Sequence, residues 1–383
     1  MGTLNTFYRM ADLPTERGFM MCFVIDNKGY VVGGSNVWPD NSAGFTCYAS
    51  NEVYNPVDNT WSTAAPLPTA RGAGVGFAIN GKGYVVGGYD GTSVLGTNEE
   101  YDPATDTWTT KAPMPTARKR CTCFVIDSIA YVVGGEDATD TPLGTTESYN
   151  PATDTWTTCA AMPTPRADLE GFELGGRGHA VCGRDAVSVL ATHEEYDPTT
   201  DTWTAKSAVT INNTERPLFQ GTCIQTSGRV MIGGGQTSLS SDAGNSSLFE
   251  YDTATDSWSL VTDIPRIRPA GLKCFTCYDI AFLVGGGYTS GTIRVGSMNF
   301  AFFASVTTAS GQVQDGAGNA MANQRVIGIS KWFKNMAFVT TSDTSGNFTV
   351  EIGGSAVGLP EDKMTVFVWP DDATLSGDIE VNL

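Results

Sequence analysis

The hydrophobic positions of the chain fall in short runs that are separated by polar turns. Examples are MMCFVI at 20–25, CTCFVI at 121–126 and KCFTCY at 273–278. Between such runs lie stretches rich in Gly, Thr, Asn and Pro. Apolar runs of about six residues that are bounded by turn residues predict β-strands, and a long helix bundle is not expected. The pattern therefore predicts an all-β protein.

The strand-like runs belong to an internal repeat. Five segments, YNPVDNTW, YDPATDTW, YNPATDTW, YDPTTDTW and YDTATDSW, end on Trp61, Trp108, Trp156, Trp203 and Trp258. These tryptophans are 47, 48, 47 and 55 residues apart, which suits one four-stranded sheet per repeat. Strands that close on a glycine pair lie upstream: YVVGG at 30–34, 84–88 and 131–135, VMIGG at 230–234 and FLVGG at 282–286. A further copy, HAVCG at 179–183, has Cys182 in place of the first glycine.

Together, the glycine doublet, the Tyr, the Trp and the P-T-x-R run that opens the next unit resemble the kelch family of β-propellers. The resemblance covers the chain from residue 4 to about residue 304. A small sheet with two apolar faces buries both only by stacking against neighbours around an axis, which agrees with a propeller. Counting the doublet positions predicts six blades, so residues 1–304 are expected to form a six-bladed kelch-type β-propeller.

The last repeat lacks its Trp strand, and the N-terminal segment supplies a substitute. Residues Asn5–Arg17 align with Asp106–Arg118, with Phe7 in the Trp position. We therefore expect the N-terminal strand to complete the last blade. Such closure removes the open sheet edges that favour aggregation.

The repeat ends at Phe303, and the pattern of apolar and polar residues changes after it. Residues 305–383 alternate apolar and polar positions around Gly and Asn turns, which predicts a small β-sandwich. The runs SGQVQDGAGN, TTSDTSGNFTVEI and VFVWP resemble transthyretin-like or carboxypeptidase-regulatory-like sandwiches. That resemblance implies a link to phage virion proteins, in which similar modules are often found.

Composition narrows the classes of partner. With 23 Lys and Arg against 41 Asp and Glu, the net charge is −18, which disfavours binding to phosphate backbones and hence to nucleic acid. The chain has no apolar run long enough to be a signal peptide or a membrane span, so membrane insertion is not expected. Nine cysteines, mostly within apolar strands, predict buried free thiols in a protein made in a reducing compartment.

The sequence contains no recognisable catalytic motif, and we expect no enzyme, cofactor or metal. No hydrolase, zincin or nucleotide motif occurs, and His179 and His193 are the only histidines. His179 is expected in the core or at the rim, and His193 at an exposed strand position. The cysteines Cys22, Cys123 and Cys274 share one strand position near the axis, where packing explains them. The acidic D-P-x-T-D turns are expected to be local Asx turns, without calcium.

A set of arginines is the candidate binding site at the mouth of the propeller, where the P-T-x-R runs enter the innermost strands. Arg120 adds charge beside them, and Trp38 lies on the longest loop of the same face, 35–50. Arginine pairs well with carboxylates, which predicts an acidic protein segment or a host-surface glycan as ligand. The alternative is that each arginine only binds nearby backbone carbonyls, and that Trp38 packs on its own loop. The candidate residues are Arg17, Arg71, Arg118, Arg120, Arg166, Arg216, Arg268 and Trp38.

Three functions fit these features. The first is a non-enzymatic structural or binding protein of a phage virion, such as a fibre, collar or decoration protein, assembled in the host cytoplasm with other virion proteins. The second is a cytoplasmic kelch adaptor that binds an acidic peptide. The third is a sugar-processing enzyme resembling sialic-acid epimerases, in which Glu170 beside Arg166 would act as acid or base. Fold alone does not separate them.

Overall fold

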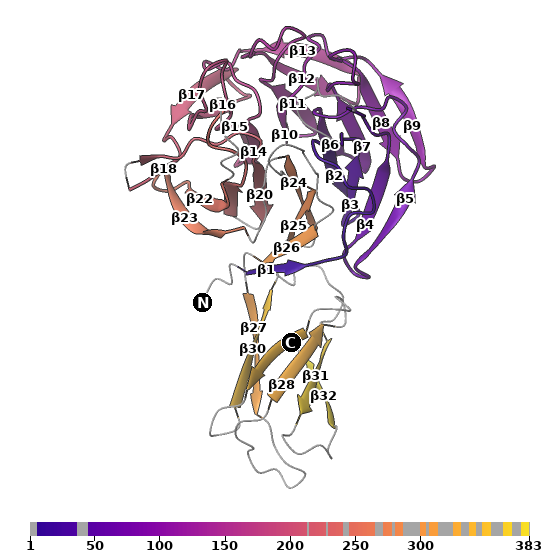
Figure 1. Cartoon of the computed structure of the whole chain (residues 1–383), viewed down its shortest axis with the longest axis vertical. Helices are drawn as coiled ribbons and strands as arrows, with labels where there is room; N and C mark the ends of the chain where they lie inside the picture. The colour runs from indigo at the N-terminus through magenta and orange to yellow at the C-terminus, as the bar shows by residue number, and fades with distance from the viewer. Residues whose placement is uncertain are drawn as a thin grey trace.

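The computed structural model is all-β, as the sequence predicts (Figure 1). It describes residues 6–36, 45–212, 214–226, 229–239, 245–264, 271–277, 280–285 and 299–303. Beyond these it describes six strand segments, at 306–312, 325–330, 337–341, 347–353, 363–369 and 377–382. Within these residues there is no helix long and apolar enough to cross a membrane.

Five four-stranded antiparallel sheets, blades 1 to 5, are each built from four strands that follow one another along the chain. Blade 1 is β2 (Met21–Ile25), β3 (Lys28–Val32), β4 (Asn51–Asn55) and β5 (Thr60–Ala64). Blade 2 is β6 (Val75–Ile79), β7 (Lys82–Val86), β8 (Asn98–Asp102) and β9 (Thr107–Lys111). Blade 3 is β10 (Thr122–Ile126), β11 (Ile129–Val133), β12 (Thr146–Asn150) and β13 (Thr155–Cys159).

Blade 4 continues the series with β14 (Glu170–Leu174), β15 (Arg177–Val181), β16 (His193–Asp197) and β17 (Thr202–Lys206). A two-stranded hairpin, β18 (Thr210–Ile211) and β19 (Thr214–Glu215), leads to the next blade. Blade 5 is β20 (Thr222–Thr226), β21 (Arg229–Gly233), β22 (Ser247–Asp252) and β23 (Ser257–Asp263).

A further four-stranded sheet, the closing sheet, joins the two ends of this region. It is ordered β1-β26-β25-β24 and consists of β1 (Thr6–Arg9), β24 (Leu272–Cys277), β25 (Ile280–Gly285) and β26 (Asn299–Phe303). Strand β1 pairs antiparallel with β26, with Thr6 opposite Phe303 and Arg9 opposite Phe300. The predicted pairing of the N-terminal strand with the last repeat is therefore confirmed.

The innermost strands form a closed circuit around the axis. Each of β2, β6, β10, β14, β20 and β24 contacts the next, and β24 returns to β2. Figure 1 shows the sheets arranged radially around these strands. The glycine doublet lies where the second strand of each blade ends. At Gly88, φ is 101° and an added Cβ would come within 2.5 Å of the Gly72 carbonyl oxygen, so only glycine fits there.

The acidic repeat segment links each blade to the chain that precedes it. In blade 2, Asp106 accepts hydrogen bonds from the Ala65 amide at 2.8 Å and from the Tyr101 hydroxyl at 2.7 Å. The Trp108 indole donates to the Ala65 carbonyl at 2.8 Å, so both backbone groups of one residue are held. Blades 1 to 5 hold Ala11, Ala65, Ala112, Ala160 and Ser207 in this way.

The held residue of blade 1 explains how the ring is tied shut. Ala11 follows β1, and its amide and carbonyl bind Asn59 and Trp61 of blade 1. The N-terminal segment therefore pairs with β26 on one side and is held by blade 1 on the other. It occupies the place that a blade-to-blade linker occupies elsewhere in the ring.

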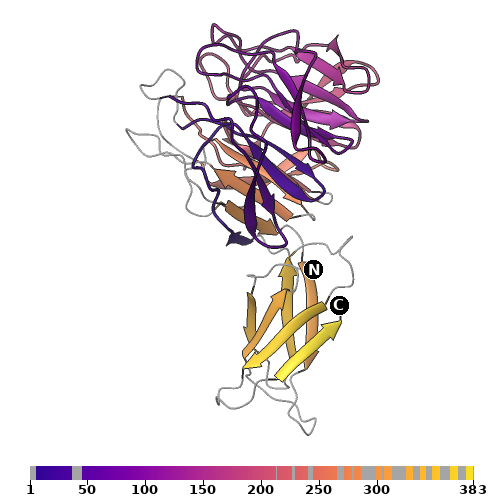
Figure 2. The same ribbon diagram turned by 90° about the vertical axis from the view of Figure 1, so that its right-hand side faces the viewer.

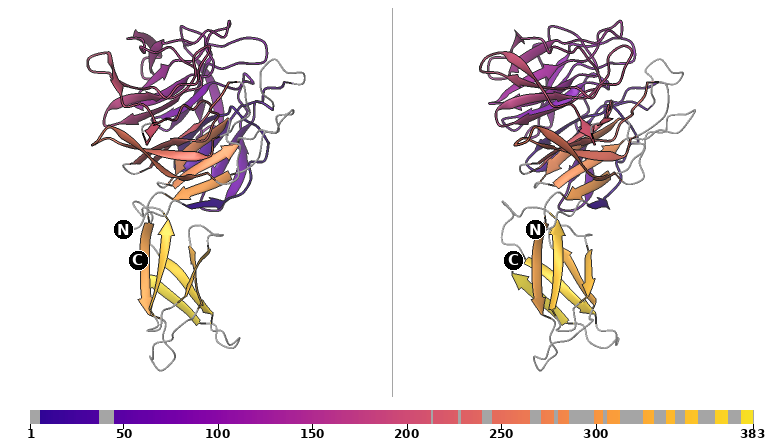
Figure 3. Two further views of the ribbon diagram at one scale, coloured as in Figure 1. Left: turned by 60° about the vertical axis from the view of Figure 1, so that its left-hand side comes forward. Right: turned by 90° about the vertical axis from the view of Figure 1, so that its left-hand side faces the viewer.

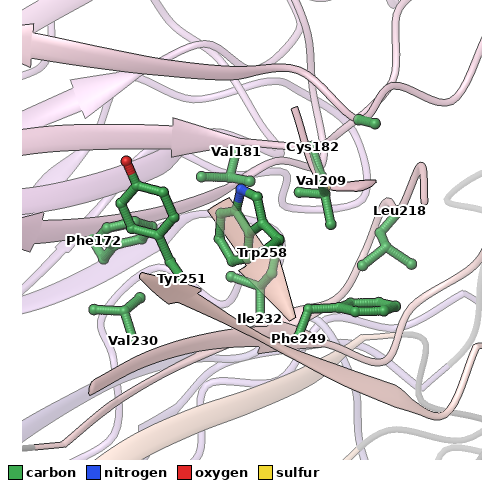
Figure 4. Packing of buried hydrophobic residues seen from close by; sticks show 11 residues of the cluster. Phe172, Val181, Cys182, Val209, Leu218, Val230, Ile232, Phe249, Tyr251 and Trp258 are labelled. Atoms are coloured by element: carbon green, nitrogen blue, oxygen red, sulfur yellow. The ribbon is translucent and has the colours of Figure 1, made fainter. Parts of the chain in front are cut away.

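The apolar core lies between neighbouring sheets. The cluster drawn in Figure 4 combines Phe172 and Val181 of blade 4 with Ile232, Tyr251 and Trp258 of blade 5. Tyr54 of blade 1 packs on Phe282 of the closing sheet, with ring centroids 5.2 Å apart. Each blade thus buries its apolar faces only through its neighbours, as expected for a propeller.

The C-terminal strands pair among themselves. Strand β27 (Val306–Gln312) pairs with β30 (Asn347–Gly353), and a second sheet is ordered β29-β28-β31-β32. Its strands are β28 (Arg325–Ser330), β29 (Ala337–Thr341), β31 (Lys363–Trp369) and β32 (Gly377–Asn382). Figures 2 and 3 show these strands outside the propeller. The sandwich fold and the boundary at 304/305 remain predictions.

Candidate binding face at the propeller mouth

Six residues that precede the innermost strands form a ring at one end of the axis, which we call the mouth. All six have left-handed backbone conformations, with φ between 53° and 71°. Five of them are not glycine, and such residues adopt this conformation only where the surrounding structure enforces it. The six are Phe19, Ala73, Arg120, Asp168, Gln220 and Gly271.

Backbone hydrogen bonds connect this ring from blade to blade. The Ala73 amide donates to the Phe19 carbonyl at 2.8 Å, and the Arg120 amide donates to the Ala73 carbonyl at 2.7 Å. The same contact recurs through Asp168 and Gln220 to Gly271, at 2.9 to 3.1 Å. The left-handed turn aims each amide at the preceding blade. The ring is therefore held by backbone atoms, and its side chains differ freely from blade to blade.

A small pocket opens inside the ring. It is lined by ring residues, including Arg120, Asp168 and Gln220, and by Glu170 and Lys273 at the beginnings of β14 and β24. Its volume is about 30 Å³, which is room for about two water molecules. The pocket therefore accepts the end of a larger ligand or a very small molecule.

One side of the mouth carries a buried network of charges. Glu136 of blade 3 is fully buried and accepts from Arg120, while Arg184 donates to Glu136 and to Asp168, both at 2.7 Å. Lys119 lies 3.7 Å from Glu136 and 3.0 Å from Asp140. Burial raises the pKa of Glu136, and the nearby Arg120 guanidinium opposes this. The network fixes the positions of Arg120 and Asp168 at the pocket rim.

Next to this network, the pocket has a polar side chain that the described residues do not pair. Gln220 is only 5% exposed, and neither atom of its amide has a hydrogen-bond partner among the described residues. Glu170 and Lys273 stand at equivalent strand positions of blade 4 and the closing sheet, by the registers of their strands. Burial raises the pKa of Glu170, an effect that Lys273 opposes. Sequence reasoning missed Gln220, because an isolated Gln carries no motif.

The predicted arginine site is largely wrong, because four of the arginines belong to the scaffold. Arg118 is fully buried, and donates to Glu147 of the same blade at 2.5 Å and to the Val132 carbonyl at 2.9 Å. It also donates to the Thr116 carbonyl at 3.2 Å. Equivalent buried pairs are Arg17–Glu52, Arg71–Glu99 and Arg166–Glu194. A guanidinium without exposed surface does not reach a partner, so these contacts support the alternative in which arginine holds the loops.

Blade 5 replaces the arginine pair by an apolar one. The Gly183 amide donates to the Leu218 carbonyl, as Gly135 does to Arg166, so Leu218 is the equivalent residue. The glutamate is replaced as well. In blade 3, Glu147 lies opposite Val132, whereas in blade 5 the residue opposite Ile232 is Phe249. Both side chains lie in the cluster of Figure 4. Arg216, the residue expected there, is exposed beside the β18–β19 hairpin.

The remaining predicted residues divide into two groups. Arg120 reaches the mouth as expected, although its guanidinium is engaged by Glu136. Arg268 and Trp38 lie outside the described residues.

The two histidines form a buried pair. His179 Nδ1 lies 2.9 Å from His193 Nε2, and the residues are 2% and 1% exposed. His179 is in the core as predicted, whereas the expectation of an exposed His193 is wrong. Burial lowers the pKa of His179 to about 4 and that of His193 to about 3. Both imidazoles are therefore neutral near pH 7. His179 packs against Phe172, and His193 packs against Trp258.

The cysteines are free thiols in the structure, as predicted. Strand registers place Cys22, Cys123 and Cys274 at one equivalent position, together with Cys223. Burial raises the pKa of Cys22 and Cys123 to about 12, so these thiols are not reactive thiolates. Within the described parts of the chain, no group of three His, Cys, Asp or Glu side chains is arranged to hold a metal ion.

Comparison with known proteins agrees with this architecture. Residues 75–115 and 117–163 match the Kelch motif, so the chain contains kelch motifs within a β-propeller fold. An F-box/kelch-repeat protein of Arabidopsis thaliana is 36% identical over 85 residues. That match spans 22% of this chain and only 21% of the relative. The solved structure of YjhT covers 78% of this chain and 97% of its own, with a TM-score of 0.62 and 14% identity, which is similarity of fold alone.

Proposed function

We propose that this protein is a non-enzymatic binding and structural protein whose kelch-type propeller presents its mouth to a protein partner. Kelch repeats generally mediate protein–protein interaction, and the chain contains them at 75–115 and 117–163. We further propose a closed ring of six blades, with the closing sheet as the sixth. In this ring the blades share one backbone geometry, and binding specificity comes from the side chains that differ between blades.

The observation that carries the proposal is where the repeats differ. The paired Arg and Glu recur in blades 1 to 4, and the Tyr, Asp or Asn, and Trp contacts recur in blades 1 to 5. At the mouth, by contrast, the six equivalent ring residues are all different. Conformationally equal positions with unequal side chains give one asymmetric, charged surface. Such a surface suits one specific partner rather than a symmetric assembly around the axis.

The finer proposal is that the partner belongs to a virion and that the protein is a fibre, collar or decoration component. Its support is the resemblance of residues 305–383 to sandwiches of phage virion proteins, together with the paired strands β27–β32. Particles purified from the native source on a density gradient should contain the protein in a fixed copy number. Its absence from particles, with all of it in the soluble fraction, would overturn the virion role.

The docking face is tested in the same system. Asp140 is 59% exposed on the mouth face, so Asp140→Lys changes the surface charge there. We expect this variant to assemble into particles poorly. The control is Asp127→Lys, the same charge change on the exposed turn between β10 and β11. Equal assembly of the two variants would contradict docking through the mouth.

One observation favours the enzyme alternative. Glu170 lines the mouth pocket, and burial raises the pKa of this carboxyl, which is the direction of shift found in catalytic acids. However, Arg166, the predicted neighbour of Glu170 in that site, is fully buried against Glu194 and offers no surface to a substrate. Binding without catalysis therefore explains the mouth with fewer additional assumptions.

A further inference from the structure

The mouth pocket contains a buried polar side chain that forms no hydrogen bond with the described residues. Gln220 is 5% exposed and lines the pocket, yet its Nε2 and Oε1 have no partner in the described structure. A buried polar group without a hydrogen bond costs about 1–3 kcal/mol. Ring position alone does not require Gln, since Ala73 and Gly271 occupy equivalent places. An external group that pairs with both atoms would remove this cost.

The surroundings of Gln220 define the chemistry of that group. Gln220 offers a donor and an acceptor side by side. The same pocket is lined by two carboxylates, Asp168 and Glu170, and by two cations, Arg120 and Lys273, so its charges balance. A carboxylate ligand would leave Gln220 Oε1 and Glu170 facing negative charge. An ammonium group would leave Gln220 Nε2 and Lys273 facing positive charge. A neutral carboxamide, which has both a donor and an acceptor, satisfies both sides at once.

Size supports the same group. The pocket volume of about 30 Å³ is room for about two waters, close to the two polar atoms of a carboxamide. Four of the lining residues are small, which leaves room beside the backbone: Ala73, Gly74, Gly221 and Gly271. The site therefore accepts the tip of an extended side chain.

From this arrangement we propose that the mouth pocket is a carboxamide site, which receives an Asn or Gln side chain from a loop of the protein partner. The carboxamide oxygen accepts from Gln220 Nε2, and its NH₂ group donates to Gln220 Oε1. Lys273 and Glu170 lie on either side to take the remaining acceptor and donor. This inference rests on the proposed function, because the partner supplies the loop.

The first test uses propionamide with the full-length protein, in which Gln side chains are labelled with ¹⁵N for NMR. The Gln220 signal is assigned by its loss in Gln220→Leu. We expect saturable shifts of this signal with propionamide, and no saturable shift with propionate or propylammonium, which have similar size but the wrong charge. Equal, unsaturated responses to all three would show a hydrated pocket only and would overturn the proposal.

The second test identifies the source of the carboxamide. A cyclic peptide with a central Gln should bind, and the same peptide with Glu should bind about tenfold more weakly or worse, since one lost buried hydrogen bond costs about that factor. If propionamide binds but the Gln peptide does not, a partner loop is excluded as the source.

Matched variants separate binding from folding. Gln220→Leu should abolish propionamide binding while keeping or raising the melting temperature, because it removes unpaired buried atoms. Gln225→Leu, at an exposed position of β20, the strand that follows Gln220, should leave binding unchanged. Failure of propionamide binding with normal assembly into particles would refute this site alone. Normal propionamide binding by a protein absent from particles would instead refute the virion role.

Discussion

At the scale of single residues, the chain contains its own comparison between a buried ion pair and an apolar pair. Blade 3 uses Arg118 and Glu147, and blade 5 uses Leu218 and Phe249 at the equivalent places. The two pairs occupy equivalent places in their blades. In each, the backbone carbonyl of the first residue, Arg118 or Leu218, accepts a hydrogen bond from a glycine amide of the preceding blade. The ion pair is worth little over an apolar pair of similar volume, but breaking it leaves one uncompensated charge in the core.

We therefore expect a strongly non-additive result in blade 3. Arg118→Leu and Glu147→Phe should each lower the free energy of unfolding by about 3–5 kcal/mol. The double variant, which reproduces the blade 5 pair, should lose less than the sum by at least about 2 kcal/mol. Urea denaturation of the four proteins measures this coupling. Additive losses would mean that the arginine's bonds to the carbonyls of Thr116 and Val132 outweigh its bond to Glu147.

The histidine pair predicts acid sensitivity. In the folded protein, burial lowers the pKa of His179 to about 4 and that of His193 to about 3, below the ordinary 6.5. The unfolded chain thus takes up protons first as the pH falls. Stability from the pair is full above pH 6.5 and declines below it, by about 2 kcal/mol per histidine at pH 5. Glu195, Lys206 and Asp256 are the charged groups that face the pair.

The measurement is the free energy of unfolding between pH 7 and pH 5. The matched control is His179→Tyr with His193→Asn, which reproduces Tyr84 and Asn98 of blade 2 at the same register positions. Between pH 7 and pH 5, the free energy of unfolding of this double variant should fall by about 4 kcal/mol less than that of the unchanged protein. The same slope in both proteins would show that other groups, such as the paired carboxylates, control acid unfolding.

At the scale of elements, β1 is the piece on which the ring depends. Deleting residues 1–12 removes both its pairing with β26 and the bonds of Ala11 to Asn59 and Trp61. An open β26 edge then remains, and exposed edges pair with other chains. We expect a lower melting temperature and dimers or aggregates in light scattering. Deletion of residues 1–5 alone, which ends before β1, is the control, and a monomeric Δ1–12 protein of unchanged melting temperature would contradict closure.

Strands and closure could be predicted from sequence because their signals are local and repeated. Each blade has the same apolar runs and turns, and the segment before Arg17 carries the same pattern. The burial of the arginines could not be predicted, because a P-T-x-R run has the same sequence whether its guanidinium is exposed or buried. The buried partner, such as Glu147, lies 29 residues away and has no motif of its own. The error at Arg216 has a similar cause, since the β18–β19 hairpin shifts the equivalence to Leu218.

At the scale of the whole molecule, we predict two independently stable parts. Limited proteolysis should cut at residues 304–305, between the end of β26 and the start of β27, and release two protected fragments, since domain boundaries fall in exposed connections. Mass spectrometry of the fragments checks the cut site, and circular dichroism checks whether each part is folded. An unfolded C-terminal fragment would mean that residues 305–383 need the propeller or a partner.

The left-handed ring at the mouth also makes the protein a natural display scaffold. Six places share one backbone geometry, and their blade-to-blade bonds use only amides and carbonyls. A phenyl ring, a methyl group, a guanidinium, a carboxylate, an amide and a lone hydrogen already occupy them in one chain. Arg120 and Asp168 must stay, because they pair with the buried Glu136 and Arg184. Randomising the codons of Phe19, Ala73 and Gln220 should therefore yield many folded proteins with altered recognition. New specificity would then arise by changing side chains at the mouth without redesigning the blades.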